Sequence, residues 1–69
     1  MRILKNRIRK FRFLNDEMTQ QQLADKLEVS RQTIHAIEKG KFNPSVKLAI
    51  HIAEVFRVTI REIFTLEDQ

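Results

Sequence analysis

Cysteine and tryptophan are absent from this sequence of 69 residues, and glycine and proline occur once each. Without thiols the chain can form neither a disulfide framework nor a thiolate metal site, and such a composition is typical of a reducing intracellular compartment. No apolar run approaches the roughly 20 residues of a membrane span, and residues 1–12 contain no apolar stretch of signal-peptide length. We therefore expect a soluble cytoplasmic protein that needs neither a metal nor another cofactor.

The short length predicts a single domain over residues 1–69. A domain of this size buries only about 60% of the surface that its unfolded chain exposes. Good helix packing or a second subunit must therefore supply the stability that disulfides would otherwise provide.

Charge is distributed unevenly along the chain. Six of the 13 basic residues lie within the first 15 residues, where there is no acid, and the net charge is +4. A basic domain favours a polyanionic partner, and the low aromatic content favours nucleic acid over a membrane surface. Charge alone does not distinguish such a binding surface from an ordinary solvated helix face.

One pattern for starting a helix occurs three times. A Ser or Thr suited to cap the helix follows an apolar residue, and a second apolar residue stands four positions after the cap. The three candidate caps are Thr19, Ser30 and Thr59. Ser45 opens a further helix after Pro44, and the helical spacing of Leu4, Ile8 and Phe11 indicates an earlier one. The sequence thus predicts an all-α fold of five helices without strands, unless residues 3–4 pair at a sheet edge.

The helix that follows Ser30 has one face of polar side chains. At 100° per residue, Ile34 and Ile37 fall on one side of this helix, and mostly polar residues fall on the other. The preceding helix ends near Leu27, so a turn of about three residues joins the two. That is the length expected of a DNA-binding helix-turn-helix, here at residues 19–39.

Arg31 and Gln32 lie at the tip of this second helix, which would enter the major groove of DNA N-terminus first. Arg can donate two hydrogen bonds to guanine, and Gln can pair with adenine. For both residues the alternative interpretation is a solvated first helical turn.

Four motifs in the middle of the chain are similar to those of a known family. They are Thr19-Gln20-Gln21-Gln22-Leu23-Ala24, Val29-Ser30-Arg31-Gln32-Thr33-Ile34, Ile37-Glu38-Lys39-Gly40 and Asn43-Pro44-Ser45. Through them the chain resembles the Cro/repressor-type (Xre-like) helix-turn-helix family over nearly its whole length. The resemblance implies a compact, five-helix, lambda-repressor-like DNA-binding domain. It also implies a transcriptional regulator, expected to be a repressor, that binds double-stranded DNA as a homodimer on a partly palindromic operator.

The outward face and the resemblance together give the candidate site residues. The expected base-contacting residues are Arg31, Gln32, His35 and Ala36. The expected phosphate-contacting residues are Gln20, Ser30, Thr33, Lys39, Lys41 and Asn43. A carboxylate facing DNA would be repelled, and the helical wheel turns Glu38 inward, where the resemblance implies a structural ion pair with Arg12. Arg9 and Lys10 could also contact phosphate, although plain surface is the more ordinary interpretation.

Two positions depart from the family pattern. Glu28 stands at the turn position that the family commonly gives to Gly, so a left-handed backbone there would be strained. The segment 15–17 contains one extra residue between the first two helices. The five Phe residues, Phe11, Phe13, Phe42, Phe56 and Phe64, are expected in the core rather than as base-stacking platforms.

Apolar residues on the helix after Ser45 span about 220° of the helical wheel, wider than one core contact requires. The last helix, expected to include Phe64 and Leu66, covers part of this face, but Ile50 has no obvious neighbour. We expect a dimer interface that includes Ile50, Phe64 and Leu66. The alternative is that the N-terminal residues fold back over the apolar face and leave a monomer that dimerises only on DNA.

Other classes of function fit less well. The chain has no catalytic constellation and no Gly-rich phosphate loop, so we do not expect an enzyme. A protein-interaction module, such as an antitoxin or a coactivator with secondary DNA binding, remains the alternative. Its docking surface would need exposed apolar anchors, whereas the outward face of the second helix offers hydrogen bonds and charge, which favours DNA.

Overall fold

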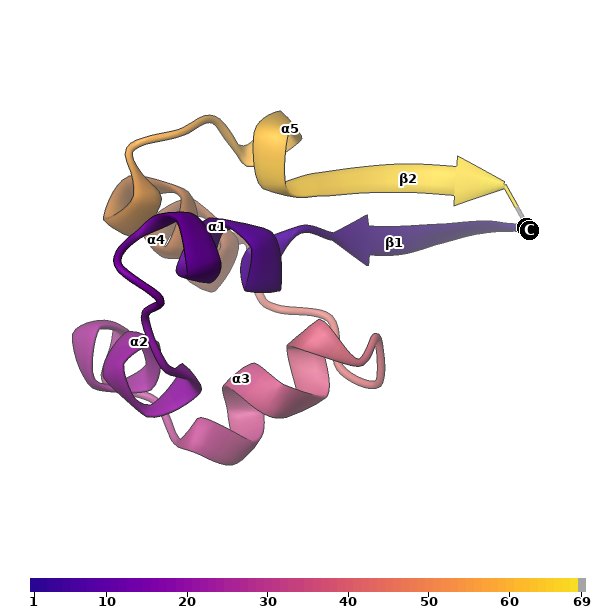
Figure 1. Cartoon of the computed structure of the whole chain (residues 1–69). Helices are drawn as coiled ribbons and strands as arrows, with labels where there is room; N and C mark the ends of the chain where they lie inside the picture. Colours follow the sequence, from indigo (N-terminus) through magenta and orange to yellow (C-terminus); the bar gives the residue numbers. More distant parts are fainter. Residues whose placement is uncertain (69) are drawn as a thin grey trace.

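Five helices form in the predicted order, and one short strand lies at each end of them (Figure 1). The computed structural model describes residues 1–68. The helices are α1 (Ile8–Leu14), α2 (Gln20–Leu27), α3 (Arg31–Glu38), α4 (Val46–Phe56) and α5 (Ile60–Ile63). The strands are β1 (Arg2–Asn6) and β2 (Phe64–Asp68). The compact five-helix arrangement is confirmed, and the exception left open for residues 3–4 is realised, because they lie in a small two-stranded sheet.

Local hydrogen bonds explain where four of the helices begin. The hydroxyl groups of Thr19, Ser30, Ser45 and Thr59 each accept a hydrogen bond from the backbone amide three residues later. At Thr19 and Thr59 the side chain of the third helical residue also accepts a bond from the backbone amide of the capping residue, which completes a capping box. Each cap satisfies helix-end donors that would otherwise lack a partner.

The turn between α2 and α3 is repeated between α4 and α5. Glu28 and Arg57 end the first helix of each pair in the left-handed conformation, with φ 58° at both. The next amide, of Val29 or Val58, donates to a carbonyl five residues earlier at 3.1 Å or 3.0 Å. The two helix pairs therefore share one backbone plan, although α5 has only 4 residues.

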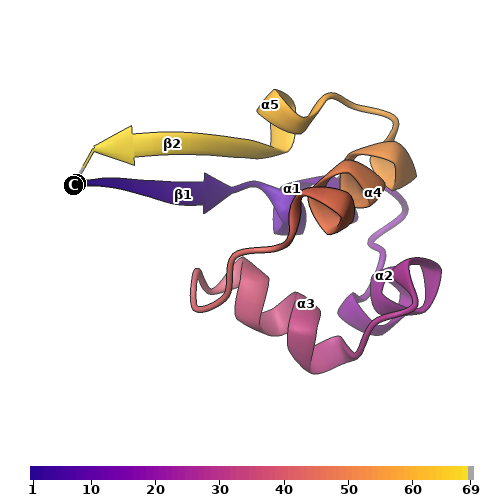
Figure 2. The ribbon, with the colours of Figure 1, turned by 180° about the vertical axis from the view of Figure 1, so that it is seen from behind.

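The two strands pair antiparallel, with Leu4 opposite Leu66 and Asn6 opposite Phe64. Leu4 was expected in the first helix, and Phe64 and Leu66 were expected in the last. These residues form strands because the two ends of the chain lie side by side and can pair. Phe64 has an extended backbone (φ −115°, ψ 133°) and does not continue α5 as a fifth helical residue. Both views show the strand pair extending away from the helices (Figures 1 and 2).

The hydrophobic core lies between the helices and under the base of the strand pair. Its fully buried large side chains are Ile8, Leu23, Ile34, Ile37, Ile52 and Ile63. Phe56 and Phe64 are also buried, and the ring of the half-buried Phe11 lies 5.9 Å from that of Phe56. Phe13 and Phe42 are 64% and 49% exposed, so the expectation that they belong to the core is wrong. Phe13 is five residues after Ile8, which turns it to the outer side of α1.

The N-terminal residues do not fold back over α4, because residues 2–6 pair with β2. Val46 and Ile50 on the outer face of α4 remain 76% and 43% exposed. Within the described residues, no helix has the length and apolar character needed to cross a membrane.

Candidate nucleic-acid interface

The outward face of α3 is a polar surface held on a buried apolar base. Ile34 and Ile37 are at most 1% exposed and anchor the helix to the core. Arg31, Gln32 and His35 are exposed on the other side, whereas Ala36 is half-buried. Their backbone is fixed by the cap at Ser30, so the tip of α3 is presented on a rigid turn.

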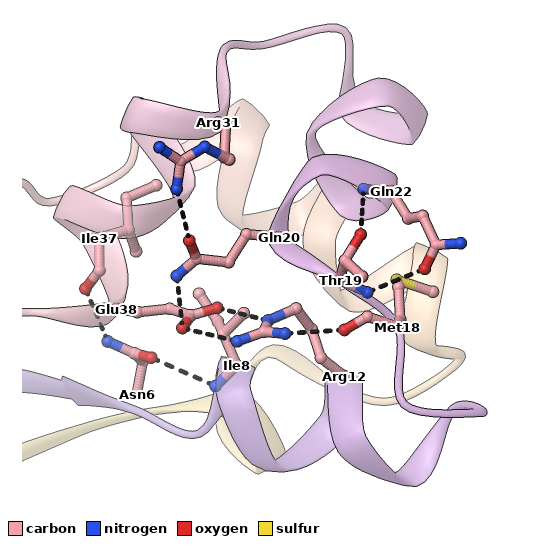
Figure 3. Close-up of polar contacts among 10 residues, drawn as sticks. All are labelled: Asn6, Ile8, Arg12, Met18, Thr19, Gln20, Gln22, Arg31, Ile37 and Glu38. Atoms are coloured by element: carbon pink, nitrogen blue, oxygen red, sulfur yellow. Dashed lines mark hydrogen bonds and ion pairs between the residues drawn. The ribbon is translucent and has the colours of Figure 1, made fainter.

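A partly buried ion pair joins α1 to the end of α3 (Figure 3). The Arg12 guanidinium donates to Glu38 at two places, with Nε to Oε2 at 2.7 Å and Nη2 to Oε1 at 3.0 Å. The side chains are only 14% and 8% exposed. Arg12 Nη1 also donates to the carbonyl of Met18 at 2.7 Å, which ties the loop before α2 to the same group. This carboxylate is therefore neutralised close to the surface that α3 presents.

The polar contacts continue from this pair to the tip of α3. Gln20 Nε2 donates to Glu38 Oε1 at 3.2 Å, and Arg31 Nη1 donates to Gln20 Oε1 at 3.4 Å (Figure 3). The side-chain amide of Gln20 is thus held between the two helices of the helix-turn-helix. Arg31 uses one of its five guanidinium donors in this contact, so the others remain available.

Asn6 was not among the sequence candidates, but it positions α3. Its Nδ2 donates to the carbonyl of Ile37 at 2.9 Å, and its Oδ1 accepts from the backbone amide of Ile8 at 3.2 Å. An Asn whose side chain accepts from the amide two residues later forms an Asx turn, a local pattern, so the second contact could have been predicted. The contact to α3 joins residues 31 positions apart and has no local signal.

Arg9 lines the same surface pocket as Gln20, Arg31, His35 and Lys39, a volume of about 490 Å³. The sequence left a phosphate contact open for Arg9 and favoured plain surface. Four cationic side chains line this pocket, those of Arg9, Arg12, Arg31 and Lys39, and its one acid, Glu38, is paired with Arg12. Such a set of donors is suited to a phosphate group.

The loop after α3 projects two further candidates. Gly40 has φ 76°, and the amides of Gly40 and Lys41 donate to the carbonyls of Ile37 and Ala36 at 3.0 Å and 2.9 Å. This closes the end of α3 and leaves Lys41 and Asn43 exposed.

Ser30 and Thr33 at the start of α3 already serve the helix cap. The Thr33 amide donates to Ser30 Oγ at 3.1 Å, and the two hydroxyl groups lie 2.9 Å apart. Each hydroxyl retains capacity for a further partner.

Of the three residues expected at a dimer interface, only Phe64 and Leu66 lie together, both on β2 and both lining one groove. Ile50 is on α4, and Leu66 is on β2, where it lines a different groove. Phe64 is 6% exposed and belongs to the core, so it offers little surface to a second subunit. In residues 1–68 no group of three or more His, Asp or Glu side chains could hold a metal ion.

A helix-turn-helix whose second helix is exposed and polar, with cations around it, defines a class of DNA-binding domains. The family model described as helix-turn-helix matches residues 8–63 of this chain. The chain belongs to the Cro/repressor-type (Xre-like) helix-turn-helix family of transcriptional regulators. The family consists of DNA-binding regulators and is not a class of enzymes.

Several known proteins are similar to this chain over most of its length. An uncharacterised HTH-type transcriptional regulator of Methanocaldococcus jannaschii is 55% identical over 65 residues, covering 94% of this chain and 97% of the relative. One from Archaeoglobus fulgidus is 47% identical over 66 residues, covering 96% and 93%. The crystal structure of a candidate DNA-binding protein from Bacteroides fragilis superposes with a TM-score of 0.78 at 25% identity, covering 91% of this chain and 100% of that one.

Proposed function

We propose that residues 1–69 form one DNA-binding unit, a sequence-specific transcriptional repressor that reads the major groove of double-stranded DNA with α3. It acts as a homodimer on a partly palindromic operator. The observation that supports this most is the exposed polar face of α3, held on a rigid turn and bordered by cations with their neighbouring acid neutralised. Repression requires only occupancy of a promoter, which a DNA-binding domain provides.

Base contacts are assigned to the outward face of α3. Arg31 suits guanine and Gln32 suits adenine, each worth about 1–3 kcal/mol of discrimination. His35 lies one turn further along as an additional hydrogen-bonding group. Ala36 offers a methyl group that can contact the methyl group of thymine.

Phosphate contacts are assigned around this face. Gln20, Ser30 and Thr33 lie where the two helices meet, and Gln20 is already oriented by Glu38 and Arg31. Lys39, Lys41 and Asn43 extend the set through the loop after α3. We add Arg9, because it borders the same pocket as Gln20 and Lys39.

Binding measured as a function of salt tests this function. We expect affinity for the DNA upstream of the chain's own gene to exceed affinity for random duplex by at least about 10³-fold. Affinity for both duplexes should fall steeply between about 50 and 200 mM salt, since phosphate contacts release counterions. Lys26→Ala on α2 is a matched control, because Lys26 is exposed but lies outside the proposed contacts. A chain that binds neither duplex at low salt would contradict the proposal.

The second candidate function is a protein-interaction module, such as an antitoxin or a coactivator. The exposed Val46 and Ile50 favour it, because they line an apolar groove of about 550 Å³ on α4. DNA binding without sequence preference, at every salt concentration tested, would favour this candidate over a repressor.

A further inference from the structure

A hollow of about 660 Å³ lies between β1 and the loop that follows α3, and we call it the β1 hollow. Its lining includes all the residues of β1 together with Lys39, Gly40 and Asn43 of the loop. In both views this loop lies below β1, beside the end of α3 (Figures 1 and 2). The contacts assigned above use the loop side of the hollow but no residue of β1.

The β1 hollow continues into the pocket beside α3, because Asn6, Glu38 and Lys39 line both. Asn6 is half-buried at this junction, and its side chain is held by the hydrogen bonds to Ile37 and Ile8 (Figure 3). The shared wall is therefore fixed by both β1 and α3. A DNA backbone that runs past α3 can follow the same surface along β1.

Two lysines without an ion-pair partner line the β1 hollow. Lys5 and Lys39 are exposed, and neither forms a salt bridge with any residue from 1 to 68. The one acid in the lining, Glu38, is already neutralised by Arg12. Like charges around one hollow raise its positive potential, and an anion placed there relieves their repulsion.

Lys5 has no acid opposite it in the strand pair. Its partner in the register is Thr65, and Glu67, two positions further along β2, accepts a hydrogen bond from Thr65 Oγ1 at 3.1 Å. Arg2, the other cation of β1, is directed to β2, where its Nε lies 3.9 Å from Asp68 Oδ1. Among residues 1–68, Lys5 is therefore the cation of β1 that remains available to a ligand.

The length of α3 decides which phosphates its surroundings can reach. Its 8 residues, at about 1.5 Å each, span about 12 Å, which matches the width of the major groove. Ser30 and Thr33 lie at the start of this span, and Lys39 and the β1 hollow lie at its end. Contacts at the two ends can therefore reach the two DNA strands that border the groove.

We propose that the β1 hollow binds a phosphate of the DNA backbone, with Lys5 as its ligand from β1 and Lys39 as its ligand from the loop. The inference rests on the proposed DNA binding by α3 and adds a second element, β1, to the interface. The phosphate belongs to the strand that borders the groove at the C-terminal end of α3. An ammonium group recognises charge and not base identity, so Lys5 contributes affinity without selecting a sequence.

Salt titrations of binding to a random duplex test the role of Lys5. Lys5→Ala should reduce the salt slope by about one unit, since one phosphate contact is lost. Its loss of affinity relative to the wild type should therefore shrink about three- to fourfold between about 50 and 200 mM salt. Lys5→Arg should keep the wild-type slope, and Lys5→Glu should weaken binding further than Lys5→Ala. Lys26→Ala removes the same charge from α2 and should leave the slope unchanged.

Neutral linkages in the duplex locate the phosphate. A series of duplexes with the sequence upstream of the chain's own gene carries one methylphosphonate each, which removes the charge of a single phosphate group. At one linkage this change should weaken the wild type at least about threefold more than it weakens Lys5→Ala. Lys39→Ala should show reduced sensitivity at the same linkage, because both lysines contact that phosphate.

Circular dichroism and sedimentation equilibrium verify that each variant keeps its fold and its oligomeric state. An unchanged salt slope in Lys5→Ala, while Lys41→Ala lowers the slope, would overturn the inference and leave the proposed function standing. A lower affinity explained by a changed oligomeric state, or no linkage with reduced sensitivity in Lys5→Ala, would overturn it as well. Binding of inorganic phosphate that depends on Lys5, with an unchanged slope for DNA, would assign the hollow to a free anion and also overturn it. A wild type that binds neither duplex contradicts the proposed function itself, and the inference with it.

Discussion

Removing one partner of the Arg12–Glu38 pair should destabilise this domain more than any other single polar change. Arg12→Met leaves the Glu38 carboxylate, 8% exposed, with only the Gln20 amide as a donor. An uncompensated buried charge typically costs about 3–5 kcal/mol, and the residual exposure of this pair argues for the lower value, about 3 kcal/mol. A 69-residue domain has about 3–10 kcal/mol of total stability, so between about a third and all of it would be lost.

A double variant that removes both charges separates the contribution of the ion pair from that of side-chain packing. Glu38→Leu alone should also cost about 3 kcal/mol, because it leaves the Arg12 guanidinium buried with only the Met18 carbonyl as an acceptor. Arg12→Met combined with Glu38→Leu removes both charges and should cost about 2–3 kcal/mol, mainly through the partners lost by Gln20 and Met18. The single costs add to about 6 kcal/mol, so a coupling of about 3–4 kcal/mol is expected.

Urea unfolding followed by circular dichroism at low temperature gives these free energies, and thermal midpoints give an independent comparison. Each single variant should lower the midpoint by about 12–24 °C. Arg2→Met is the matched control, because Arg2 pairs with Asp68 at the exposed end of the strands and its loss should cost less than about 0.5 kcal/mol. If the costs of the two single changes add up to the cost of the double variant within about 0.5 kcal/mol, the reasoning is refuted.

Four further predictions follow from the candidate interface and the turns. Arg31→Ala and Gln32→Ala should abolish operator selectivity with little change in thermal midpoint, since both side chains point away from the core; a matching loss of helical signal would contradict their role as readers. Lys41→Ala should weaken binding to all sequences alike and reduce the salt slope by about one unit, whereas loss at a single base position would argue against a phosphate contact. Arg9→Ala should behave like Lys41→Ala in the same titrations, and unchanged affinity would remove it from the interface. Glu28→Gly should stabilise the domain by about 0.5–1 kcal/mol, because φ 58° strains a residue that has a Cβ. Arg57 has the same φ, so Arg57→Gly should give a similar gain in the same urea titrations. A loss of stability in both variants would contradict the explanation.

Much of the local structure could be predicted from the sequence because the interactions behind it span only a few residues. The caps at Thr19, Ser30, Ser45 and Thr59 are hydrogen bonds to the amide three positions later, and they begin the helices where the pattern indicated. The two faces of α3 follow from helical periodicity alone. The left-handed turn at Glu28 agrees with the family's preference for Gly at that position.

The strand pair could not be predicted in the same way. Leu4, Ile8 and Phe11 fit a helical period, but helix α1 begins only at Ile8 because Leu4 pairs with Leu66 from the other end of the chain. The sequence around Phe64 likewise fits either a longer helix or a strand. Pairing between distant segments decides such cases, and a local window of sequence contains only one of the two partners.

The features of the candidate interface also fall into two groups, those that local sequence predicts and those that depend on the tertiary structure. The sequence determined which residues stand on the outward face of α3, because the turn length and the helical period place them there. Only the tertiary structure decided which other elements reach that face: Asn6 bonded to the end of α3, Gln20 held between Glu38 and Arg31, and Arg9 beside the same pocket. The physical reason is that these contacts join side chains on different helices and strands, whose relative positions depend on how the whole core packs.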